Sequence, residues 1–145
     1  MRRTVVSQLR VNFKEILIST GKRKELREIT AEAAKAVSES PVSNGICVIY
    51  STHTTSAIVV NENEGGLTQD ILKKVVEDYP SGRGWQHDRI DDNADAHLGG
   101  TFIGPSVTIP IRDGALVLGT WQSIFFLELD GPRQSRKVII EIMGE

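Results

Sequence analysis

An aspartate-glycine pair in the C-terminal third of the chain most constrains its fold. Asp113-Gly114 separates two β-prone runs, residues 106–111 and 115–119, and Asp-Gly favours a two-residue hairpin because glycine accepts a positive φ without steric cost. A turn this tight joins antiparallel strands. Further strands are expected over residues 4–11, 13–19, 45–52, 57–61, 121–130 and 136–143. The sequence therefore predicts a largely antiparallel sheet.

Two helices are expected among these strands. Over residues 22–39 apolar side chains recur at helical spacing up to Pro41, and over residues 67–79 a similar pattern ends at Pro80. No repeat or linker divides the chain, whose length suits one domain. We therefore predict a single α+β domain over residues 1–145, an antiparallel, sandwich-like sheet with two helices packed on it.

Composition narrows the class of protein. A net charge of −2 shows no basic excess, which argues against nucleic acid as a partner. No apolar stretch approaches the roughly 18 residues that span a bilayer, and the N-terminus lacks the apolar region of a secretory signal. A cytoplasmic protein without a membrane partner is expected. Cys47 and Trp121 are both predicted to be buried in the core.

Residues 81–100 form a long stretch without apolar periodicity. It contains glycines, charges and two of the three histidines, His87 and His97. A long unpatterned segment inside a compact domain is usually functional or disordered. The third histidine, His53, follows a predicted strand. All three lie in polar segments, which favours a shared polar pocket.

Three neutral imidazoles with an open fourth position are typical of a catalytic zinc site. His53, His87 and His97 are therefore candidate ligands of a divalent metal, zinc first, with Mn, Ni or Mg as alternatives. The spacing of His87 and His97 fits no standard zinc motif. Unrelated surface histidines and acid–base histidines without a metal remain open as interpretations.

Other polar residues suggest a phosphorylated ligand. The hydroxyls of Thr54, Thr55 and Ser56 adjoin His53, and Arg133 and Arg136 follow a turn; arginine is the preferred bidentate partner of phosphate. These five residues are predicted to bind a small phosphorylated metabolite, although threonines in strands and exposed arginines are also common without a ligand.

Carboxylates provide candidate bases for the same chemistry. Glu62 and Asp95 are predicted as catalytic bases. The run containing Glu62 precedes a predicted helix, so it could instead serve as a helix cap.

The segments 52–57, 61–64, 87–97, 106–111 and 119–122, with the spacing between them, resemble the YjbQ-like family, also called the secondary thiamine-phosphate synthase family. The resemblance runs from about residue 13 to the C-terminus. It implies a sandwich-type α+β fold, a homotrimer, and a metal-binding cluster of His53, His87 and His97. It also implies a weak transferase activity that joins hydroxymethylpyrimidine diphosphate to thiazole phosphate.

Diphosphate release usually uses Mg²⁺, which prefers oxygen ligands, whereas imidazoles favour Zn²⁺, Mn²⁺ or Ni²⁺. This conflict keeps two alternatives open. One is a metal-dependent hydrolase of a phosphoester or similar bond, and the other is a non-catalytic trimeric module that binds a metabolite.

Overall fold

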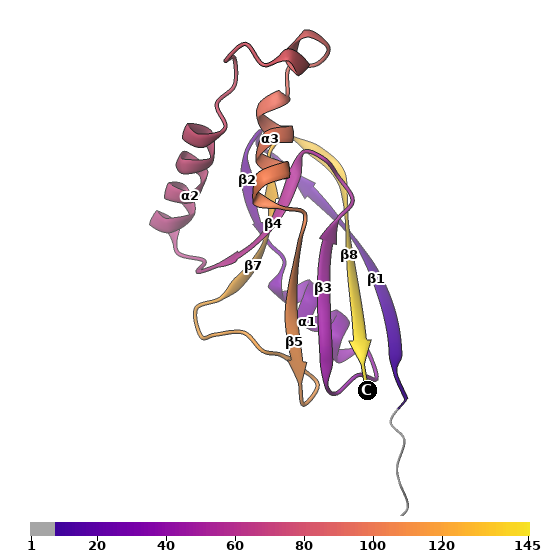
Figure 1. The fold of residues 1–145 in the computed structure, drawn as a ribbon. Coiled ribbons are helices and arrows are strands. Elements are labelled where there is room, and N and C mark those ends of the chain that lie inside the picture. The colour runs from indigo at the N-terminus through magenta and orange to yellow at the C-terminus, as the bar shows by residue number, and fades with distance from the viewer. Residues whose placement is uncertain (1–7) are drawn as a thin grey trace, which may run out of the picture.

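The protein is described here by a computed structural model that covers residues 8–145. Figure 1 shows its strands and helices. One sheet has five strands in the order β1-β8-β3-β5-β6, and the other has three in the order β2-β7-β4. Every strand pair is antiparallel. The larger sheet comprises β1 (Arg10–Thr20), β8 (Arg133–Gly144), β3 (Gly45–Ser51), β5 (Ser106–Arg112) and β6 (Ala115–Leu116).

The smaller sheet separates two apolar cores. It comprises β2 (Glu25–Glu28), β7 (Ser123–Glu128) and β4 (Ser56–Asn61). Because side chains alternate along a strand, Phe126 of β7 faces the main core, shared with the large sheet and α1 (Thr30–Ser38), whereas Leu127 faces a second core. The second core lies against α2 (Gly65–Asp78) and α3 (Ala94–Ile103). Two sheets with helices in layers confirm the predicted α+β sandwich.

The predicted hairpin is present. Asp113 and Gly114 have φ values of 51° and 77°, the positive values that such a turn requires, and β5 pairs with β6 across them. The strands predicted over residues 45–52 and 57–61 appear as β3 and β4, and Cys47 is buried as expected. Of the two strands predicted over residues 4–19, the described part forms one continuous strand, β1, and residues 4–7 lie outside the described residues.

The helix predicted over residues 22–39 is wrong over residues 22–29. Residues 25–28 form β2, paired with β7 through Leu26 opposite Leu127, and the helix begins only at Thr30. The spacing of Leu26 and Ile29 fits a helix, but pairing with a central strand overrides that local preference.

A third helix was not predicted. The unpatterned stretch contains a short 3-10 helix, Gln86–Arg89, and the first seven residues of α3. Alanines and glycines form the buried side of α3, so the helix lacks the large apolar side chains that reveal helical periodicity. Among residues 8–145, no helix is long and apolar enough to cross a membrane.

Candidate active site

A polar pocket opens where β3 ends beside α3. Its volume is about 340 Å³, and it is lined by the side chains and backbone of residues 50–54 and 56 on one wall and of His97, Gly100, Thr101 and Pro105 on the other. His53 and His97 thus face one cavity, although 44 residues separate them in the sequence (97 − 53). None of the lining residues is acidic. The pocket wall therefore carries no carboxylate that would repel an anion.

A glycine permits the close approach that forms this pocket. At Gly100 of α3, a Cβ atom would lie 2.7 Å from the Thr54 carbonyl oxygen and 3.0 Å from that of Ser56. Only a residue without a side chain lets the helix backbone lie this near to the segment that carries His53. The contact between α3 and β4 brings His97 to the pocket.

We expect Gly100→Ala to lower the free energy of unfolding by about 1–3 kcal/mol, because backbone atoms cannot yield to the added methyl group without moving the helix. Urea denaturation measures this change. Gly65→Ala is the matched control, since Gly65 also lies in a helix but has open space around it. Equal effects of the two substitutions would contradict the close packing at Gly100.

His53 is held by the backbone of β8. The amide N–H of Lys137 donates a hydrogen bond of 2.7 Å to Nε2 of His53. A neutral imidazole that accepts at Nε2 carries its proton on Nδ1. His53 therefore has an N–H at Nδ1 with which it can donate a hydrogen bond.

The surroundings of His53 keep its ring neutral. Burial and the charges of Arg136, Arg133 and Lys137 lower the pKa of His53, and Glu128 opposes them only in part. We expect an NMR pH titration to give His53 a midpoint below 6.5. Because its pKa is depressed in the folded state, the stability that His53 contributes is present above about pH 6.5 and is lost as the pH falls through the lowered pKa. A midpoint at or above 6.5 would contradict the geometry at Lys137.

His87 and His97 form an edge-to-face pair. Their ring centroids lie 4.7 Å apart at an interplanar angle of 77°. The Asp88 side chain accepts from the backbone N–H of Ala94, at the start of α3, and so ties the 3-10 helix that carries His87 to the helix that carries His97. The fold thus brings His97 to the same pocket as His53 and packs it against His87.

The predicted metal centre requires that the three imidazoles offer free nitrogens to one ion. Within residues 8–145, no group of three His, Cys, Asp or Glu side chains is arranged to hold a metal ion. Nε2 of His53 already accepts a hydrogen bond, and Nδ1 carries the proton, so neither nitrogen is free as a ligand. The described arrangement therefore does not fit a metal ion that is bound by all three histidines. Zinc, or another divalent metal, stays a prediction.

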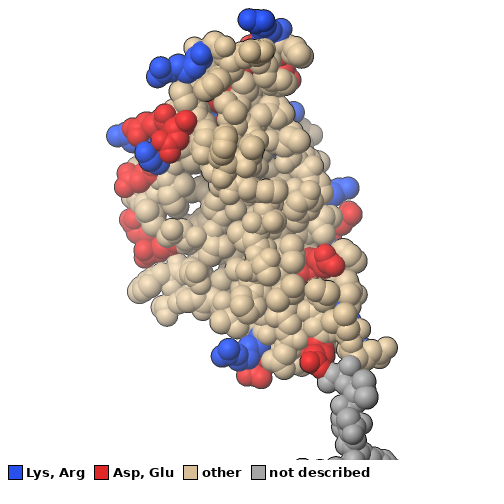
Figure 2. All heavy atoms as spheres, in the orientation of Figure 1, with Lys and Arg blue, Asp and Glu red and all other residues tan. Residues whose placement is uncertain are grey.

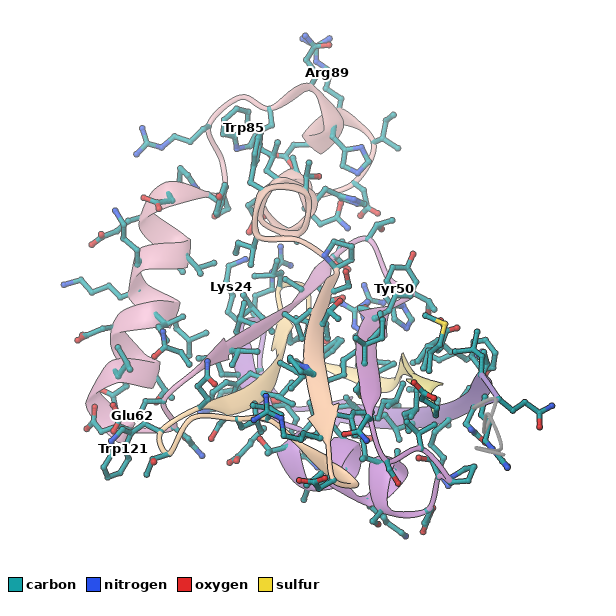
Figure 3. All side chains as sticks on the ribbon, turned by 60° about the horizontal axis from the view of Figure 1, so that its bottom comes forward. Lys24, Tyr50, Glu62, Trp85, Arg89 and Trp121 are labelled. Atoms are coloured by element: carbon teal, nitrogen blue, oxygen red, sulfur yellow. The ribbon has the colours of Figure 1, made fainter. Side chains whose placement is uncertain are left out.

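The two predicted carboxylate bases lie outside the pocket. Asp95 is 3% exposed and is bound by Arg23 at 3.1 Å and by Lys24 at 2.8 Å. Glu62 follows β4 at the end opposite His53, and Figure 3 shows it well away from Tyr50, which lines the pocket. Trp121 is 71% exposed, so its prediction as a core residue is wrong.

The predicted phosphate-binding residues separate into two groups. Thr54 and Ser56 line the pocket. Arg136, by contrast, is 5% exposed and pairs with Glu128, which is 0% exposed. Its guanidinium also donates to the Thr55 hydroxyl at 2.9 Å. Arg136 and Thr55 are therefore buried and do not line the pocket.

Arg133 lies close to the pocket without lining it. It is half-exposed and pairs with Asp130 at 3.0 Å.

The carboxylates of Glu128 and Asp130 were not predicted as part of the site, because they lie at the end of an apolar run that predicts only a strand.

A second hollow has a different character. It has a volume of about 400 Å³ and lies between α2 and the small sheet, lined mostly by apolar residues such as Leu67, Ile71 and Leu127. Openings beside α2 are visible in Figure 2. Its few charged residues, Asp70, Lys74 and Asp78, lie on α2. No histidine lines this hollow, so the polar pocket is the better candidate for chemistry.

Comparisons with known proteins agree with the fold. The family described as UPF0047 protein YjbQ-like matches residues 14–145. A UPF0047 protein of Archaeoglobus fulgidus is 46% identical over 89% of this chain and 99% of its own. The UPF0047 protein YugU of Bacillus subtilis is 37% identical over 91% of this chain and 99% of its own. A crystal structure of a YbjQ-like protein of unknown function from Sulfolobus solfataricus superimposes with a TM-score of 0.94 at 49% identity, covering 95% of this chain and 100% of that one.

Proposed function

The chain belongs to the YjbQ-like UPF0047 family, and we propose that it is an enzyme acting on a small phosphorylated metabolite between His53 and His97. The observation that carries the proposal is the pocket itself. Two histidines and several hydroxyls line it, and no carboxylate does. The charges that lower the pKa of His53 come from Arg136, Arg133 and Lys137, so the field behind the pocket favours an anion.

In this proposal the imidazoles perform acid–base chemistry. The Nδ1–H of His53 donates a hydrogen bond to the oxygen on which negative charge develops, and His97 on the opposite wall accepts or returns a proton. Thr54 orients the phosphate through its hydroxyl, whereas the Thr101 hydroxyl donates to the His97 carbonyl at 2.7 Å. A positioned pair of this kind contributes by orientation as well as by proton transfer.

The specific reaction that we propose is thiamine-phosphate synthesis. The thiazole nitrogen forms a C–N bond to the methylene carbon of the pyrimidine while the C–O bond to diphosphate breaks, and the diphosphate leaves with the electron pair. His53 then stabilises the departing diphosphate oxygen. This assignment draws on the family resemblance, and the absence of acidic side chains from the pocket wall is compatible with a diphosphate leaving group.

A second candidate is hydrolysis of a phosphoester, because the pocket is small. A volume near 340 Å³ lies at the lower end of the range for ligand sites, and one phosphorylated substrate fills less space than two. In this alternative a histidine takes the proton of the attacking water.

Turnover assays on the purified protein, with and without a chelator, distinguish these functions. Pyrophosphate release that requires both hydroxymethylpyrimidine diphosphate and thiazole phosphate supports the synthase, and phosphate release from simple esters supports the hydrolase. Binding of these compounds without turnover would support a metabolite-binding module and reject the enzyme. Elemental analysis of the same sample tests the divalent metal.

We further propose that the chain works as a homotrimer, in line with the family resemblance. The face shown in Figure 2 carries few charged side chains, and exposed Tyr50 and Phe102 lie on β3 and α3, which favours contact with a second copy. Light scattering should give about three times the 16.0 kDa subunit mass. A mass of one subunit in dilute solution would contradict this assembly.

A further inference from the structure

A chain of hydrogen bonds runs behind His87 and away from the pocket. Nε2 of His87 lies 3.1 Å from Oδ1 of Asn93, and Nδ2 of Asn93 donates at 2.9 Å to Asp130. Asn93 and Asp130 are both about 8% exposed, whereas His87 is exposed. A buried amide therefore contacts Nε2 of an exposed imidazole, and a buried carboxylate holds that amide from the other side.

The carboxylate of Asp130, at the end of this series of hydrogen bonds, is held ionised. Arg133 donates to Oδ2 of Asp130 at 3.0 Å, and Arg23 lies 2.9 Å from Oδ1. Burial raises the pKa of Asp130, but the hydrogen bond from Asn93 and the charges of Arg23 and Arg133 outweigh it, so the pKa lies below its ordinary value. An ionised carboxylate only accepts hydrogen bonds.

The orientation of the Asn93 amide follows from that charge. Its NH₂ group must face Asp130, because an amide oxygen would repel the carboxylate. The amide oxygen then faces His87 and can only accept. A neutral imidazole in this position carries its proton on Nε2 and leaves Nδ1 unprotonated.

We infer that Asn93 and Asp130 are positioning residues that fix the Nε2–H tautomer of His87, so that Nδ1 is left as a proton acceptor on a ring that packs edge to face against His97. His53 and His87 then have opposite tautomers, one with a donor and the other with an acceptor at Nδ1. The catalytic use of this acceptor rests on the proposed function, whereas the tautomer itself does not.

Two-bond ¹H–¹⁵N spectra of the ligand-free protein test the tautomer directly at about pH 8.5, where histidines with ordinary pKa values near 6.5 are neutral. The wild type should show His87 as a single Nε2–H tautomer. Asn93→Leu and Asp130→Ala should each produce a mixture of both tautomers, because the fixed acceptor is lost or becomes free to rotate.

Asn63→Leu is the matched control. It removes an asparagine-to-carboxylate hydrogen bond of 2.6 Å, to Glu28, far along the sequence from His87, and should leave the His87 spectrum unchanged. An Nδ1–H tautomer in the wild type, or an unchanged single tautomer in folded Asn93→Leu, would overturn the inference. If one variant fails to fold, the wild-type spectrum and the other variant still decide it.

These spectra are independent of turnover. A single Nε2–H tautomer in an inactive protein would retain the inference and reject the proposed function. Under the proposed function, Asn93→Leu should also lower kcat with KM nearly unchanged, since Asn93 does not line the pocket.

Discussion

Replacing Glu128 with glutamine is expected to lower the free energy of unfolding by about 3–5 kcal/mol, the cost of leaving one member of a buried ion pair without its partner. Glu128 is fully buried and accepts from Arg136 and, at 2.7 Å, from the Thr20 hydroxyl. Urea denaturation at pH 7 measures the change. Glu15→Gln is the control, because Glu15 forms only an exposed pair with Lys137 at 3.9 Å, and surface pairs contribute about 0–1 kcal/mol.

The pH dependence of this substitution provides a second check. Burial alone would raise the pKa of Glu128, but hydrogen bonds from Arg136 and Thr20 outweigh it, so the pKa is lowered. The resulting stability is present above the ordinary glutamate pKa and is lost as the pH falls through the lowered value. Glu128→Gln should therefore flatten the loss of stability in acid. An unfolding energy within 1 kcal/mol of the wild type would contradict the role of the pair.

The second large effect is expected on catalysis. His97→Gln should lower kcat/KM by about 10²–10⁴-fold, the usual contribution of a positioned acid–base group, with the unfolding energy nearly unchanged because His97 is only half-buried at the pocket wall. The assay is pyrophosphate release from the two thiamine precursors, or phosphate release if the protein is a hydrolase.

Threonine substitutions provide the matched comparison for this effect. Thr54→Val removes a hydroxyl from the pocket and should raise KM, whereas Thr108→Val alters an exposed residue of β5 that does not line it and should change neither constant. Activity of His97→Gln within twofold of the wild type would remove His97 from the mechanism.

Turn residues and apolar periodicity predicted those strands and helices that depend on neighbouring residues in the sequence. The Asp113-Gly114 hairpin, β3, β4 and α2 all follow from turn chemistry or from periodicity. The start of α1 could not be predicted, because Leu26 is assigned to a strand by its pairing with β7. The helix α3 was missed because its buried side consists mainly of small residues, which leave no apolar periodicity.

It was easier to predict from the sequence which residues lie at the site than to predict what each residue does there. Their polar sequence surroundings made His53 and His97 candidate site residues, and both line the pocket. Partners far along the chain determine the remaining roles. Arg136 donates to the Thr55 hydroxyl, 81 residues away, and Asp95 is bound by Lys24, 71 residues away. No spacing in the sequence reveals such pairs, because they depend on how the two sheets meet.

The central claim is that the pocket between His53 and His97 binds a phosphorylated small molecule. With three histidines in the chain, their ring signals can be followed individually by NMR as inorganic pyrophosphate is added at constant pH and ionic strength. We predict saturable shifts of the His53 and His97 signals, weakened in Thr54→Val and unchanged in Thr108→Val. Histidine signals that stay in place up to millimolar pyrophosphate, or shift equally in both threonine variants, would contradict the claim.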